Sequence, residues 1–91
     1  MPSFDINRAW QLHPQVSVRP EPFGALLYHF GTRRLSFLKD RTLLALVQRL
    51  RTEPSARSAC TAVGLSGTDL QRYEQALGVL AASAMVIERT P

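Results

Sequence analysis

The chain has 91 residues, of which 45% are hydrophobic, and it carries a net charge of +4. This length fits one domain with a modest core, and the hydrophobic content excludes a disordered chain. No apolar run approaches the roughly 18 residues of a membrane span, and residues 1–8 contain no apolar segment of the signal-peptide type. We therefore expect a cytoplasmic protein without a membrane partner.

The N-terminal part is predicted to contain one strand between two irregular segments. Residues 1–14 follow neither strand nor helix spacing, and we expect Trp10 to pack onto the single domain formed by residues 15–91. Residues 15–19 alternate apolar and polar side chains, which predicts a short strand. The R-P-E-P sequence at residues 19–22 is expected to leave regular pairing, because its two prolines lack an N–H donor.

Two further strands are predicted to form a hairpin. Residues 23–30 are apolar on both faces, so this strand is either covered on both sides or presents one face to a partner, a second copy of the chain being one candidate. Gly31 and Thr32 are expected to form the tight turn, with Gly31 at positive φ. Residues 34–38 form the third strand, with Leu35 and Phe37 on one face and three residues on the other: Arg34, Ser36 and Leu38.

Three helices are expected after the hairpin. Asp40 is a predicted N-cap for a helix that runs to about residue 51, and a short second helix is predicted from Pro54 or Ser55 to Val63. A third helix at residues 67–83 follows Ser66, which resembles the start of a capping box, and residues 85–87 form a closing strand. The order predicts an α+β fold, a three-stranded antiparallel sheet followed by three helices, of the winged helix-turn-helix type.

The excess positive charge is concentrated in the hairpin half of the chain. Residues 1–50 contain seven basic and three acidic residues, whereas residues 51–91 contain four of each. Such a patch attracts acidic partners, although a solvated charged surface is an equally ordinary interpretation. Four basic residues lie around the third strand: Arg33, Arg34, Lys39 and Arg41.

The sequence contains no motif for catalysis, nucleotide binding or metal binding. His13 and His29 lie in separate segments with no Cys, Asp or Glu at metal-ligand spacing. The only cysteine, Cys60, lies in a small apolar stretch and is predicted to be a buried core residue. We therefore expect neither an enzyme nor a bound cofactor or metal.

DNA binding and peptide binding are the two remaining functions. In a winged-helix DNA reader the third helix meets the phosphates, but here Asp69, Arg72 and Glu74 sum to −1, which argues against a nucleic acid partner. A third strand at the sheet edge can instead accept an added strand through its unpaired main-chain groups. An ordinary edge protected by charge is the alternative interpretation, and the residues alone do not separate the two.

The hairpin sequence closely resembles a known family. R-P-E-P-F-G-A-L-L-Y at residues 19–28, followed by R-R-L-S-F-L-K at residues 33–39, is similar to the peptide chaperones of the mycofactocin system. These are PqqD-like RiPP recognition elements, which bind precursor peptides of ribosomal origin. The resemblance extends from Trp10 to Ile87; the hairpin motif is specific, whereas the helical part supports it only by length and order.

The resemblance implies a non-enzymatic chaperone that binds the leader region of the mycofactocin precursor peptide and delivers it to a radical SAM maturase. It also implies that the guest peptide adds as a strand to the third strand and lies against the third helix. Leu35, Phe37, Leu70 and Leu77 are alternatively core residues. The implied peptide-binding residues are Arg33, Arg34, Leu35, Ser36, Phe37 and Leu38 in the strand, and Asp69, Leu70, Arg72, Tyr73 and Leu77 in the helix.

Overall fold

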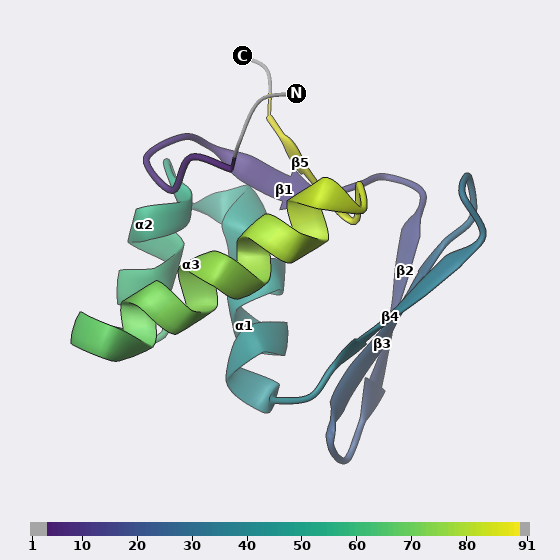
Figure 1. Ribbon diagram of the computed structural model, residues 1–91, viewed down its shortest axis with the longest axis horizontal. Helices are drawn as coiled ribbons and strands as arrows, with labels where there is room; N and C mark the ends of the chain where they lie inside the picture. Colours follow the sequence, from purple (N-terminus) through teal and green to yellow (C-terminus); the bar gives the residue numbers. More distant parts are fainter. Residues whose placement is uncertain (1–3, 90–91) are drawn as a thin grey trace.

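The computed structural model describes residues 4–89 and shows an α+β fold, which confirms the predicted class (Figure 1). Residues 1–3 of the predicted irregular segment and residues 90–91 of the predicted domain lie outside the described residues. The elements in chain order are β1 (Trp10–Leu12), β2 (Val16–Glu21), β3 (Gly24–His29), β4 (Arg34–Leu38), α1 (Arg41–Arg49), the 3-10 helix η1 (Leu50–Thr52), α2 (Ala56–Ala62), α3 (Gly67–Ala82) and β5 (Val86–Glu88).

The three-stranded sheet is antiparallel with the order β2-β3-β4, as predicted. The expectation that residues 19–22 leave regular pairing is wrong, because β2 continues through Pro20, which lies opposite Ala25, to Glu21. Proline is tolerated there because β2 is an edge strand. Gly24 closes the turn with φ of 151°, and a Cβ at this position would collide with the carbonyl oxygen of Leu38.

The turn between β3 and β4 differs from the prediction at Gly31. Positive φ falls on Arg33, at 62°, and not on Gly31. The buried His29 ring organises this four-residue loop, because its Nδ1 accepts hydrogen bonds from the N–H groups of Gly31 and Thr32 at 3.0 and 3.1 Å. A side chain therefore supplies the acceptor for these two donors, and the left-handed residue comes last in the loop.

A second, two-stranded sheet joins the two ends of the described chain. Strand β1 pairs with β5 so that Trp10 lies opposite Glu88, which corrects the expectation that residues 10–12 are irregular. The closing strand predicted at residues 85–87 is confirmed with a shift of one residue. The expected packing of Trp10 is also confirmed, since the ring is buried and its Nε1 donates to the carbonyl of Asp5 at 2.7 Å.

Local capping signals account for the starts of α1 and α2 but not of α3. The carboxylate of Asp40 accepts hydrogen bonds from two N–H groups of α1, and the hydroxyl of Ser55 accepts one from Ser58. Ser66 forms no capping hydrogen bond, so the predicted capping box is wrong. The reason is the left-handed φ of 59° at Gly67, which turns the first residue of α3 away from regular helix geometry.

The core lies between the inner face of the three-stranded sheet and the helices. Ala25, Leu27 and Leu38 of the sheet belong to one buried cluster with Leu46 of α1 and Leu77 of α3. Cys60 is a buried free thiol, as predicted, and burial raises its pKa. Within residues 4–89, no helix combines the length and apolar character needed to cross a membrane.

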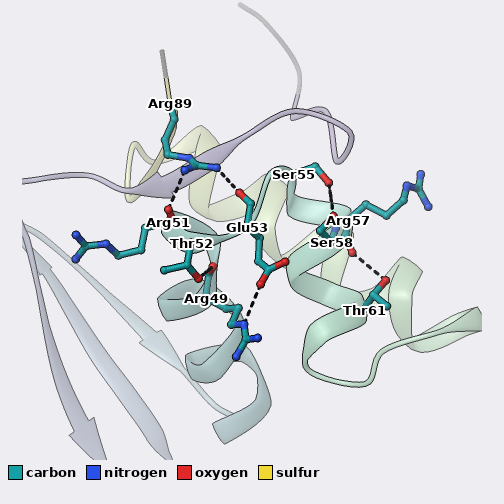
Figure 2. Close-up of polar contacts among 9 residues, drawn as sticks. All are labelled: Arg49, Arg51, Thr52, Glu53, Ser55, Arg57, Ser58, Thr61 and Arg89. Carbon is teal, nitrogen blue, oxygen red and sulfur yellow. Dashed lines mark hydrogen bonds and ion pairs between the residues drawn. The ribbon is translucent and has the colours of Figure 1, made fainter. Parts of the chain in front are cut away.

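A polar cluster fastens the C-terminal strand to the helical part (Figure 2). The guanidinium of Arg89 donates hydrogen bonds to the carbonyl oxygens of Arg51, at 2.8 Å, and Glu53. The main-chain N–H of Arg89 donates to the carbonyl of Ala9 at 2.9 Å. Arg89 therefore links η1 to the strand pair β1–β5.

Candidate functional site

Strand β4 forms one edge of the three-stranded sheet. It pairs with β3 from Arg34, opposite His29, to Leu38, opposite Ala25, and no other strand among the described residues pairs with it. In an antiparallel ladder successive residues direct their main-chain groups to opposite sides. Half of the N–H and C=O groups of β4 are therefore available on the side away from β3, which is what strand addition requires.

The side chains of β4 divide between the two faces of the sheet. Leu38 is fully buried on the inner face, and Ser36 is half-buried beside it. Leu35 and Phe37 lie on the opposite face with 55% and 61% of their surfaces exposed, so they are not core residues. A guest on the β4 edge would therefore be held by main-chain groups, while Leu38 supports the strand from within.

The α3 residues of the predicted site divide in a similar way. Leu77 is fully buried in the core, and Leu70 is partly buried against it. Asp69 and Arg72 are exposed and form an ion pair, with 3.5 Å between the Arg72 Nη1 and the Asp69 Oδ1. The guanidinium of Arg72 also lies 5.7 Å from the centre of the Tyr73 ring. Asp69 and Arg72 are thus the exposed charged residues of α3.

Tyr73 connects α3 to the end of β4. Its hydroxyl donates a hydrogen bond to the carboxylate of Asp40, which stands two residues after Leu38. Burial alone would raise the pKa of Asp40, but hydrogen bonds from Tyr73 and from two main-chain N–H groups outweigh this effect and hold its pKa below the usual value. The same hydrogen bond raises the pKa of Tyr73. The ionised Asp40 carboxylate thus links α3 to the start of α1, two residues after the end of β4.

The positive charges around β4 have no internal partners. Arg8, Arg19, Arg49 and Arg72 form ion pairs with carboxylates. In the part of the chain that the structure describes, no ion pair involves Arg33, Arg34, Lys39 or Arg41. Unpaired surface charges attract acidic ligands at long range and are screened by salt.

Comparisons with known proteins identify the family of the chain. Residues 9–87 match the model of the Peptide chaperone MftB family. This match spans the chain from just before β1 to within β5, so it includes the β4 edge and α3. The chain belongs to this family.

Named relatives cover nearly the whole chain. The chain is 62% identical to the Peptide chaperone MftB of Mycobacterium tuberculosis over 86 residues, which are 94% of this chain and 79% of the relative. It is 54% identical to the Peptide chaperone MftB of Mycolicibacterium smegmatis over 89 residues, which are 98% of this chain and 87% of the relative. No solved structure matches the chain. The family is one of chaperones and not of enzymes, in agreement with the sequence analysis.

Two features of this MftB-family chain were not found from its sequence. The link between Tyr73 and Asp40 joins residues 33 positions apart, and no local pattern signals it. The ring centres of His13 and His29 lie 4.3 Å apart. Neither ring belongs to a cluster of three metal-ligating side chains, because residues 4–89 contain no such cluster. His29 is 2% exposed and serves the β3–β4 turn, so its role in the described structure is to shape the start of β4.

Proposed function

We propose that the chain is a non-enzymatic chaperone that binds the leader region of the mycofactocin precursor peptide and presents it to a radical SAM maturase. The observation that carries the proposal is that, within residues 4–89, the edge of β4 is open and the arginines that flank it have no ion-pair partners. Membership of the Peptide chaperone MftB family supports a peptide as the ligand. We also propose that the three helices and the sheet form a PqqD-like, winged helix-turn-helix-like arrangement.

In the proposed complex the leader adds as a fourth strand beside β4. Main-chain hydrogen bonds to the free edge supply most of the affinity, and Arg33 and Arg34 attract acidic side chains of the leader. On α3, Asp69, Arg72 and the rim of Tyr73 contact the other side of the guest. Leu38, Leu70 and Leu77 hold the two elements in place from the core.

A peptide fits this surface better than a DNA duplex does. The exposed face of α3 presents Asp69 paired with Arg72, so the charge that a phosphate would meet there is already compensated. The uncompensated arginines lie instead at the start of β4, beside main-chain groups that a strand can use. Both features favour an acidic extended peptide.

Calorimetric titration with synthetic leader peptides tests the proposal. One peptide carries N-methyl groups on three odd-numbered residues and a second carries them on three even-numbered residues, because alternate residues of an added strand face β4. Each lost hydrogen bond costs about 1 kcal/mol, so one peptide should bind about a hundredfold more weakly than the unmodified leader, and the other should bind nearly normally. Equal affinities of the two methylated peptides would contradict strand addition, and failure of the unmodified leader to bind would contradict the proposed ligand.

A further inference from the structure

The face of the three-stranded sheet that is turned away from the helices is largely apolar. We call it the outer face. Cross-strand pairing places Leu26 opposite Phe37 and Tyr28 opposite Leu35, so these four side chains share it. Turn residues extend it at both ends, since Phe23 lies 6.4 Å from Phe37 and Phe30 lies 5.0 Å from Tyr28, ring centre to ring centre. The outer face comprises Phe23, Leu26, Tyr28, Phe30, Leu35 and Phe37.

Most of this face remains exposed within the described residues, although Leu26 and Tyr28 are half-buried. Phe23 is 47% exposed and Phe30 is 59% exposed, and Leu35 and Phe37 are exposed to a similar degree. Contiguous apolar surface of this kind marks an interaction site in a soluble domain. The apolar part is restricted to β3, β4 and their turns, because β2 places Ser17 opposite Tyr28 and Arg19 opposite Leu26. The surface therefore has an apolar centre and a polar margin on the β2 side.

The charge around the outer face indicates what kind of protein covers it. Residues 22–39 contain three basic residues and no acidic residue, and Glu21 on the β2 margin is compensated by its ion pair with Arg19 at 3.0 Å. Arg33 and Lys39 stand just before and just after β4, whereas Arg34 shares the inner face of β4 with Ser36 and Leu38; none of the three forms an ion pair within the described residues. A second copy of the chain would bring the same positive margin against this one, which like-charge repulsion disfavours. An apolar surface with an acidic margin is the complementary partner.

We propose that the outer face is the docking surface for the peptide-modifying enzyme, through an apolar contact surface of that enzyme with an acidic rim. This inference rests on the proposed function for the identity of the enzyme. The docking surface uses the outward side chains of β4, whereas the leader site uses the free edge of the same strand. The chaperone can therefore hold the leader and the enzyme at the same time.

The test measures binding of the purified radical SAM maturase and of the leader peptide to the same set of chaperone variants. Phe23→Thr/Phe30→Thr removes two exposed rings of the outer face that lie outside the leader site. Val79→Thr is the matched control, because Val79 is 69% exposed on α3. Lys39→Glu reverses one charge of the margin. Circular dichroism and urea unfolding establish that each variant is folded.

We expect the double variant to bind the maturase at least about tenfold more weakly, while Val79→Thr binds normally and both variants retain leader affinity within about threefold. Lys39→Glu should weaken maturase binding mainly at low salt. The inference is overturned if the double variant binds the maturase as tightly as the wild type does. It is also overturned if the wild type binds the leader but does not bind the maturase. A wild-type dimer that the double variant abolishes in sedimentation would also overturn it. If the wild type does not bind the leader, the proposed function itself is refuted.

Discussion

The hydroxyl of Tyr73 in α3 donates a hydrogen bond to the carboxylate of Asp40 at the start of α1. The Oδ1 atom of the same carboxylate caps α1 by accepting from the N–H groups of Thr42 and Leu43 at 2.6 and 3.0 Å. One side chain thus fixes the end of β4, the first turn of α1 and the middle of α3 relative to one another. The spacing of the proposed leader site depends on this junction.

Replacing Tyr73 by phenylalanine should destabilise the chain by about 1 kcal/mol, because a half-buried hydrogen bond is lost while the ring remains. Urea unfolding measures the change. Tyr28→Phe is the matched control, since the described structure contains no hydrogen bond from its hydroxyl, and it should change the free energy of unfolding by less than about 0.5 kcal/mol. Equal effects of the two substitutions would show that the Tyr73 hydrogen bond contributes nothing.

The lowered pKa of Asp40 predicts a loss of stability in acid. The Asp40 carboxylate binds a proton less tightly in the folded state than in the unfolded state. The stabilisation of the folded state by ionised Asp40 is therefore complete above the usual carboxyl pKa of 3.8, and it is lost as the pH falls through the lower folded pKa. Asp40→Asn keeps a capping oxygen but not the charge. Its free energy of unfolding should be lower than that of wild type at about pH 7, and the two should converge as the pH falls from 3.8 through the lower folded pKa of Asp40. Parallel pH profiles would contradict this assignment.

Arg89 should contribute measurably to the attachment of β5. Its guanidinium donates to two main-chain carbonyls of the η1 region, and Arg89→Met keeps much of the side-chain volume but removes both bonds. We expect a loss of about 1.5–3 kcal/mol in the free energy of unfolding. Arg51→Met is the control, because the Arg51 guanidinium points away from this cluster and forms no drawn contact (Figure 2). An equally large decrease in the free energy of unfolding of Arg51→Met would indicate a general effect of removing a positive charge.

The arginines at the start of β4 should govern the salt dependence of leader binding. Arg33→Ala/Arg34→Ala should weaken binding of an acidic leader about tenfold at low salt, and the difference from wild type should shrink as salt screens the exposed charges. Arg51→Ala/Arg57→Ala removes the same charge from the η1 and α2 region and serves as the control. A loss that persists unchanged in high salt would mean that the arginines make buried contacts with the leader.

Features of the fold that depend on near neighbours could be predicted from the sequence. Asp40 caps N–H groups two and three residues ahead of it, and the alternation of residues 34–38 gave the limits of β4 correctly. Strand β1 could not be predicted in this way, because its three residues form a strand only by pairing with β5, and Trp10 lies opposite Glu88. Pro20 misled the prediction because its effect depends on whether the strand lies at an edge.

The two faces of β4 could be separated from the sequence, but the side that meets the helices could not. Leu35 and Phe37 are as apolar as Leu38, and only the register with β3 shows that Leu38 joins Ala25 in the core while the other two are exposed. The peptide-binding residues were assigned from the family resemblance and not from chemistry visible in the chain. The Tyr73–Asp40 link, which sets their spacing, required the three-dimensional structure.

Pro20 has a further consequence at the other edge of the sheet. It interrupts the row of N–H donors along β2, whereas β4 contains no proline. The β2 edge therefore offers fewer donors to an added strand than the β4 edge, which disfavours repeated pairing of β4 with β2 between copies of the chain. In the proposed complex a single guest strand therefore adds at β4, because the opposite edge of the sheet is the poorer acceptor.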